Sequence, residues 1–385
     1  MKHSNSVFHQ LLKHLPRHQF QKAVDRHKGD HRVRTLPCWT QLISLMFAQM
    51  TGLTSLRDLE ENFNTKRNHP YHLGVERIKR SSLSDANNNR PSAIFMETFF
   101  YLLGKVRGEL PRKDEEEMVR LIDSTTIDLN LNQFEWASFR STKAGIKLHT
   151  VYDPDADIPT YFEMTAAKVN DRKEAHKLPI IPGATYVVDR AYNDYGWYYS
   201  LTQQGTRFVG RMKSNAIYEV IENRETTTSH ILEDQIIRLS SVKAQKDCPT
   251  DLRRVTILRE DDGKVLSFIT NDLVRTAQEI ADLYKSRWQI ELFFKWIKQN
   301  LKIKRFLGQS ENAVKIQVLS AMTAYLLLRL TQITTHCKLS LQQIARRVGL
   351  NLTSRCSLLE LFTDPPEKNK VNLHHNQGSL ELVYA

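Results

Sequence analysis

The spacing of hydrophobic positions changes along the chain and divides it into regions of different predicted structure. From Val7 to about Val106, apolar residues recur with helical spacing, which predicts an all-α N-terminal region. From Met118 onward, short strand-type apolar runs alternate with helical segments, as a mixed sheet flanked by helices requires. Between Asn215 and Asn271 the helical period disappears and β-type runs replace it. The pattern therefore predicts an α/β fold with a β-rich insertion.

The α/β part is expected to follow the order strand, strand, strand, helix, strand, helix, strand. The strands are predicted at residues 118–123, 145–152, 160–165, 185–188 and 207–212, and the helices at residues 170–178 and 194–204. Further strands are predicted in the insertion at residues 217–221, 235–239, 254–258 and 265–269.

Two helices are predicted in the N-terminal region at residues 39–50 and 55–63, joined by a short turn that contains Gly52. Such a pair is compatible with a helix-turn-helix, and two ordinary bundle helices are an equal alternative. Residues 79–87 predict either another short helix, rich in groups that can contact phosphates or bases, or a polar loop.

Charge points to the kind of partner. The chain has 55 Lys and Arg residues against 43 Asp and Glu, a formal net charge of +12. Between Tyr284 and Phe306, seven Lys or Arg residues accompany a single acid, Glu291. A basic cluster predicts a polyanionic partner, although a solvated charged face is the commoner origin of such clusters. The acid inside this cluster favours a binding site.

Other features argue against a secreted or membrane protein. The four cysteines form no CxxC pair, so neither a zinc site nor a disulfide framework is indicated, and a reducing cytoplasm is predicted. Residues 1–17 lack the apolar core of a signal peptide. The most apolar stretch, residues 313–333, is interrupted by Lys315, Gln317 and Arg329, which predicts a core helix rather than a membrane span.

Residues 284–298 predict one continuous helix with a chemically distinctive face. At about 100° per residue, Tyr284, Arg287, Glu291 and Lys298 fall within a stripe about 60° wide. The neighbouring arc is apolar, so the helix can bury one side and present a carboxylate flanked by cations to a cleft.

Two further acids, Asp123 and Asp189, are expected at the ends of predicted strands. Alone, each is most simply a turn or cap residue, and Glu291 alone is most simply part of a surface ion pair. Three carboxylates in one cleft repel one another unless a cation neutralises them, and oxygen-rich sites suit Mg²⁺ or Mn²⁺. Two such ions about 4 Å apart assist in-line displacement at phosphorus. In combination, the acids predict metal-dependent phosphodiester chemistry.

The spacing of the signature residues then identifies a family. Tyr284, two residues, Arg287, three residues, Glu291, six residues and Lys298 resemble the Tyr-Arg-Glu-Lys signature of bacterial insertion-sequence transposases of the DDE class, in insertion-sequence family four. The segments 121–125 and 188–194 look like those around the first and second Asp of this family. The resemblance covers about residues 1–340 and implies a ribonuclease-H-like mixed-sheet core, interrupted by a β-rich insertion and preceded by an all-α domain.

The resemblance also implies roles for single residues. Asp123, Asp189 and Glu291 would be catalytic and would bind Mg²⁺, with Mn²⁺ as a substitute and two ions in the site. The residues that would contact DNA are Tyr284, Arg287, Lys298, Arg211, Lys213 and Arg190. The chain departs from its relatives at Ala191, where Gly is usual, and in having no Trp in the insertion to stack a flipped base. Tyr218, Phe268 or Trp288 would be substitutes for that Trp, and Trp288 is at least equally expected to be a core or helix-packing residue.

The function implied is cut-and-paste transposition: cleavage at transposon ends and strand transfer into target DNA by a homodimer in a synaptic complex. A catalytically silent DNA-binding protein derived from a transposase and a stand-alone nuclease are the alternatives. The expected domains are a helical DNA-binding domain (1–112), the two parts of the core (113–214 and 272–340), the insertion (215–271) and a C-terminal tail (341–385). The expected location is the bacterial cytoplasm, in association with the nucleoid.

Overall fold

A large mixed sheet forms the centre of the molecule. The structure is a computed structural model that describes residues 5–65, 72–226, 228–259, 261–300 and 305–363. Its ten-stranded sheet has the order β2-β3-β1-β5-β6-β10-β9-β8-β7, and β4 pairs with β3. The core strands are β1 (Val119–Leu129), β2 (Ser138–Arg140), β3 (Lys143–Asp153), β4 (Ile158–Ala166), β5 (Thr185–Val188) and β6 (Arg207–Arg211).

The core strands follow the ribonuclease-H-like arrangement that the family resemblance implied. β1, β3 and β4 pair antiparallel, whereas β5 joins β1 in parallel and β6 joins β5 in parallel. β5 is a short apolar strand and is buried at all four positions, as a parallel strand covered on both faces should be. The predicted α/β fold class is therefore confirmed.

The predicted β-type runs of residues 215–271 extend the same sheet. They form β7 (Tyr218–Asn223), β8 (Ile231–Leu239), β9 (Leu252–Leu258) and β10 (Val265–Thr270). β10 returns to pair antiparallel with core strand β6, with Phe268 opposite Arg211. A short helix, α10 (Val242–Asp247), which the sequence pattern did not predict, separates β8 from β9. The extension therefore continues from the core strand that carries Arg211.

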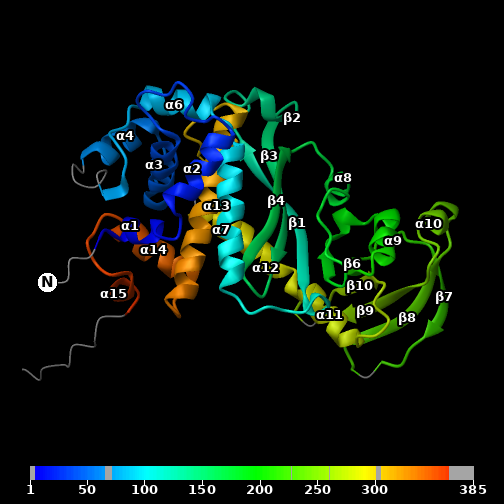
Figure 1. The fold of residues 1–385 in the computed structure, drawn as a ribbon. Coiled ribbons are helices and arrows are strands. Elements are labelled where there is room, and N and C mark those ends of the chain that lie inside the picture. The colour runs from blue at the N-terminus through cyan, green and yellow to red at the C-terminus, as the bar shows by residue number, and fades with distance from the viewer. Residues whose placement is uncertain (1–4, 66–71, 227, 260, 301–304, 364–385) are drawn as a thin grey trace, which may run out of the picture.

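Helices cover both faces of the core strands (Figure 1). The short helix α8 (Asp171–Ala175) and α9 (Tyr195–Gln203) lie on one face, with the 3-10 turn η3 (Arg190–Tyr192) just before α9. On the other face lie α12 (Trp288–Asn300) and the long α13 (Glu311–Thr334). The N-terminal helices lie around α13: α1 (Val7–Leu12), α2 (Arg17–Arg26), α3 (Cys38–Thr51), α4 (Leu56–Thr65), α6 (Arg80–Asn89) and α7 (Ala93–Gly108).

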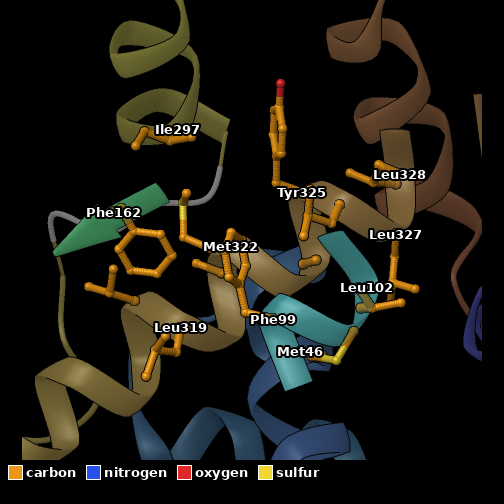
Figure 2. Close-up of a cluster of buried hydrophobic side chains, with 14 of the residues drawn as sticks. Met46, Phe99, Leu102, Phe162, Ile297, Leu319, Met322, Tyr325, Leu327 and Leu328 are labelled. Carbon is orange, nitrogen blue, oxygen red and sulfur yellow. The ribbon is translucent and has the colours of Figure 1, made fainter. Parts of the chain in front are cut away.

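Helix α13 holds the N-terminal helices and the sheet together. In Figure 2, its Leu319 and Met322 lie beside Phe99 of α7 and Phe162 of β4. The rings of Phe99 and Phe162 are in edge contact, with centroids 4.8 Å apart. Among the described helices, α13 alone is long and apolar enough to cross a membrane, but 89% of its apolar window is buried inside the protein. This burial is the one expected of the predicted core helix.

The chain after α13 differs from the predicted tail. Residues up to 363 form α14 (Leu341–Asn351) and α15 (Leu358–Phe362), which lie beside α1 (Figure 1). Backbone N–H groups of Val7 and Phe8 donate to the carbonyls of Ser354 and Leu352 at 3.0 and 2.9 Å. The apolar residues of α14 explain this docking, because a helix with an apolar stripe must cover it. Residues 364–385 of the predicted tail lie outside the described part of the chain.

The two N-terminal helices around Gly52 form as predicted, as α3 and α4. Gly52 ends α3 in the left-handed conformation (φ 77°), and α3 is buried at every position from Cys38 to Gln49. The exposed surface of α4 includes Asp58 and Glu61. These acids on the second helix favour the alternative of ordinary bundle helices over a helix that enters a DNA groove. The other predicted helix of this region forms as α6.

Candidate active site

Asp123 lies on β1, and Asp189 directly follows the neighbouring parallel strand β5. In the register of β1 and β5, Ile122 is opposite Val188, so each acid is the residue after this last pair. Parallel strands lie roughly 4.8 Å apart, which brings both side chains out at the same level. Leu121 and Val187, two residues earlier, belong to the apolar cluster beneath α12 and α13. Because side chains alternate along a strand, both acids project toward that helical face.

The prediction that Asp123 ends a strand was wrong. β5 ends at Val188, directly before Asp189 as predicted, but β1 continues to Leu129. The reason is the antiparallel partner β3, which pairs with β1 past the site and places Thr150 opposite Asp123. Asp123 is therefore held in mid-strand, with less backbone freedom than a residue in a loop.

Glu291 lies on α12, which begins directly after Arg287. The prediction of one continuous helix over residues 284–298 was also wrong, because α11 (Ala277–Ser286) ends before Arg287. At the junction, Arg287 N–H bonds to the Tyr284 carbonyl at 3.1 Å and Ile290 N–H bonds to the Arg287 carbonyl at 3.2 Å. These bonds span three residues and tighten the turn, while Arg287 keeps right-handed helical angles.

The acids and the signature side chains contact one another directly. Arg287 Nη1 lies 3.2 Å from Asp123 Oδ2, and its Nη2 lies 2.5 Å from Glu291 Oε1. The Tyr284 hydroxyl donates to Asp189 Oδ1 at 3.3 Å. The guanidinium of Arg287 also lies 5.7 Å from the centroid of the Tyr284 ring. The structure therefore gathers three acids, distant in sequence, around two neighbouring side chains.

The electrostatics of this cluster show in the pKa of Asp123. This pKa is raised from 3.8 to about 6; burial is the main cause, and the nearby charges of Asp189 and Glu291 act in the same direction. The Ser124 backbone N–H, which donates to Asp123 Oδ1 at 2.8 Å, and the Arg287 guanidinium act in the opposite direction. Without a cation, the site is therefore a poor environment for all three negative charges.

The donor set fits a hard divalent cation, but in this arrangement Arg287 supplies the positive charge. Within the described residues, no three acid, imidazole or thiol groups are placed to hold an ion together. The Arg287 guanidinium bridges Asp123 and Glu291 instead. Carboxylate oxygens are the ligands that Mg²⁺ and Mn²⁺ prefer, so displacement of the guanidinium would leave a suitable oxygen set.

An open cleft of about 390 Å³ lies beside the acids. Asp123 and Glu291 line it together with Lys298, so the fourth signature residue shares the site. The rest of its wall comes from Ser124, Thr125, Phe294, Lys295 and Gln299. A wall that carries both acids and lysines suits a phosphate-bearing strand held near bound cations.

The other residues predicted to contact DNA lie around the ends of β5 and β6. Arg211 ends β6, and its positive charge partly offsets the effect of burial and of Asp189, which together raise the pKa of Tyr284. Arg190 follows Asp189 directly and is exposed, whereas Lys213 is half-buried. Contact of these three residues with DNA remains a prediction.

The aromatic residues considered for base stacking differ in exposure. Trp288 is 59% exposed, so the expectation of a core position for it was wrong. Phe268 is buried against the Tyr284 ring, with centroids 4.5 Å apart, and cannot receive a base. Tyr218 is half-buried, with the Arg254 guanidinium 5.2 Å from its ring centroid. Of the three aromatic residues, Trp288 is therefore the most exposed.

Sequence reasoning missed one polar group at the site. Asp171, at the start of α8, accepts a hydrogen bond from the Ser124 hydroxyl at 2.7 Å. In the sequence it follows Asn170, an ordinary helix-capping residue, and so looks like part of a helix start. Its pairing with Ser124 depends on tertiary packing, and no sequence signal identifies it.

Two protein families match parts of the chain. Residues 114–327 match the family described as Transposase DDE domain, and residues 3–76 match a Domain of unknown function (DUF4372). The chain is 43% identical over 253 residues to "Putative transposase y4zB" of Sinorhizobium fredii, covering 64% of this chain and 70% of that protein.

A second relative is "Probable transposase for insertion sequence element IS5377" of Geobacillus stearothermophilus, 30% identical over 71% of this chain and 74% of that protein. Among solved structures, a piggyBac transposase synaptic complex with hairpin DNA is similar, with a TM-score of 0.46 and 11% identity, covering 94% of this chain and 81% of that chain. The family match covers more than half of the chain, and its sequence relatives are transposases. The chain therefore belongs to the Transposase DDE domain family and is a DNA transposase.

Proposed function

We propose that the chain belongs to the insertion-sequence group with the Tyr-Arg-Glu-Lys signature and cuts and joins DNA at one metal-dependent centre formed by Asp123, Asp189 and Glu291. The observation that carries this proposal is the gathering of the three acids around Tyr284 and Arg287. An ordinary surface ion pair accounts for Glu291 and Arg287, but it does not account for Asp123 and Asp189 on adjacent strands beside them.

The three carboxylates would hold Mg²⁺, or Mn²⁺ in its place, as two ions. Bound there, the ions supply activation of the attacking water or hydroxyl and stabilisation of the leaving oxygen. The mid-strand position of Asp123 and the hydrogen bond from Tyr284 to Asp189 keep two of the carboxylates oriented. A rigid donor set is what a positioned reaction at phosphorus needs.

The basic side chains would position the DNA strand. Arg287 has a planar fork suited to bidentate phosphate contacts and would move from the acids to the scissile strand. Lys298, in the cleft wall, acts as a point charge on the same strand. Arg211, Lys213 and Arg190 would extend this basic surface along the strand ends. These contacts fix position and carry little sequence readout.

The wider assignment follows from the same proposal. The partners are double-stranded transposon ends and target DNA, bound by a homodimer in a synaptic complex, in the bacterial cytoplasm and in association with the nucleoid. The helical residues 1–112 would read the ends, residues 113–214 and 272–340 would carry the chemistry, and residues 215–271 would form the insertion.

The direct test uses Asp123→Asn, Asp189→Asn and Glu291→Gln with labelled transposon ends in Mg²⁺. Each variant should lose cleavage by at least about 10³-fold, in the range found when a central catalytic electrostatic group is removed, while DNA binding is retained. Glu311→Gln is the matched control, because Glu311 is an exposed acid that pairs with Lys315 one helical turn away. Wild-type cleavage in all three variants would refute the centre.

The same assay separates the two alternatives. Tight binding of ends by the wild-type chain without nicking in Mg²⁺ or Mn²⁺ would indicate a silent DNA-binding protein. Nicks without products joined to target DNA would indicate a stand-alone nuclease. Joined products support the transposase.

A further inference from the structure

A buried polar cluster lies on the opposite face of the sheet from Asp123. Side chains alternate along β1, so Ser124 projects toward α8 and α9, where Ile122 and Val188 belong to the second apolar cluster. On the neighbouring strand β3, His149 lies opposite Ser124. Polar groups among apolar side chains cost free energy unless they are well paired, so a cluster at this position calls for an explanation.

Asp171 is the centre of this cluster. Its Oδ1 accepts from the Ser124 hydroxyl at 2.7 Å and lies 3.2 Å from Lys147 Nζ and 3.4 Å from His149 Nδ1. Lys147 also donates to the Val169 carbonyl at 3.0 Å, just before the turn into α8. The Asp171 side chain is 19% exposed and that of His149 is 2% exposed. Several partners and little solvent leave the carboxylate with one orientation.

One partner of Asp171, Ser124, is the immediate neighbour of Asp123 in the chain. The Ser124 hydroxyl contacts Asp171, and the backbone N–H of the same residue donates to Asp123 Oδ1 at 2.8 Å. Tyr192, in the turn that follows Asp189, is buried close by, and burial and the negative charges of Asp171 and Asp123 raise its pKa. Asp171 therefore touches the support of Asp123 directly and lies close to the turn that supports Asp189.

We propose that Asp171 is a positioning residue of the active site, which acts through Ser124 to fix the orientation of the Asp123 carboxylate for metal binding. This inference rests on the proposed function of Asp123. Groups that orient metal-binding carboxylates typically contribute 10- to 100-fold to metal affinity or activity, so an effect of about that size is expected.

The experiment compares Asp171→Ala, Ser124→Ala and the double variant in the full-length chain. Each single variant should lower kcat for end cleavage by about 10- to 100-fold and raise the dissociation constant for Mn²⁺, measured by electron paramagnetic resonance without DNA, by a similar factor. KM for the DNA ends should not change: Ser124 lines the cleft, but the hydroxyl that Ser124→Ala removes is bonded to Asp171 on the opposite face of the sheet from Asp123. The double variant should lose no more than either single variant, because both remove the same link.

Two further variants separate positioning from general loss of stability. Asp171→Asn keeps an oxygen that accepts from Ser124 and should recover most of the Mn²⁺ affinity that Asp171→Ala loses. Asp155→Ala is the control, because Asp155 is about half exposed and pairs with Lys113 on the surface, and it should behave as wild type. Thermal unfolding curves establish that each variant is folded. If Asp171→Ala does not fold, Ser124→Ala and Asp171→Asn decide the question alone.

Different results would contradict the role of Asp171 and the proposed function. Wild-type kcat and Mn²⁺ affinity in Ser124→Ala, or losses that multiply in the double variant, would overturn the role of Asp171. A wild-type chain that does not cleave ends would instead contradict the proposed function, and the Mn²⁺ titrations would still test whether Asp171 positions Asp123.

Discussion

Arg287 occupies the place in which a metal ion would neutralise the acids, and its removal has a consequence for stability that can be calculated. In the metal-free chain, Arg287→Ala leaves Asp123 and Glu291 without their bridging cation. Their negative charges then repel each other and Asp189 in a site that is only partly open to solvent.

The size of the effect follows from burial. The Asp123 and Arg287 side chains are 18% and 14% exposed. Breaking a fully buried ion pair costs about 3–5 kcal/mol, whereas an exposed pair contributes about 0–1 kcal/mol. With Glu291 one-third exposed, the site lies between these limits. Arg287→Ala should therefore lower the free energy of unfolding by about 1–3 kcal/mol without metal.

Mg²⁺ should reduce this difference in stability. At a concentration of 100 times the dissociation constant, a bound ion stabilises the folded chain by about 2.7 kcal/mol. In the wild-type chain the ion must displace Arg287, so its stabilising effect is smaller than in the variant. The assay is thermal unfolding of both proteins with and without MgCl₂. Arg238→Ala, which removes an exposed pair with Asp251, serves as the control and should show the wild-type response to Mg²⁺. Equal gains of wild type and Arg287→Ala would refute the reasoning.

Three other predictions concern separate parts of the molecule. The folded-state pKa of Asp123 is about 6, against an ordinary value of 3.8, so ionisation of this carboxyl lowers the stability of the fold as pH rises from about 4 to 6. At about 1.4 kcal/mol per pKa unit, metal-free Asp123→Asn should be up to about 3 kcal/mol more stable than wild type at pH 7.5 and equally stable near pH 4. Urea unfolding at the two pH values measures this difference. Three basic residues are exposed on one loop: Lys28, Arg32 and Arg34. Glutamate at any of them should weaken binding of DNA ends and reduce the slope of log affinity against log salt concentration by about 1 per lost phosphate contact, whereas the control Arg57→Glu on acidic α4 should not. An unchanged slope would contradict this. Phe99→Ala should cost about 3–5 kcal/mol and lower one common melting transition, since α7, α13 and β4 share a core; separate transitions would count against that core.

The sequence was sufficient to predict most strands, because their apolar runs are short and lie between turn residues. Residues 185–188 were predicted as a buried strand and form β5 with the same limits. The segment around Asp123 was predicted too short, because its extension depends on β3, which pairs with it only in the folded sheet. Local pattern identifies a strand, but its length depends on the partner.

In the active site, too, some features follow from the local sequence and others depend on the folded sheet. The spacing of Tyr284, Arg287 and Glu291 predicted a shared face, and these residues do meet at the acids despite the break between α11 and α12. The adjacency of Asp123 and Asp189 depends on the parallel register of β1 and β5, which no local signal encodes. Asp171 was missed for the same reason, since its partner Ser124 is 47 residues away.

The central claim is that Asp123, Asp189 and Glu291 bind divalent cations together. The most direct measurement is anomalous X-ray scattering from crystals of the chain grown with saturating Mn²⁺. Anomalous peaks are expected between the three carboxylates, with the Arg287 guanidinium withdrawn from Asp123. Manganese bound elsewhere, with Arg287 still bridging Asp123 and Glu291 at saturation, would contradict it.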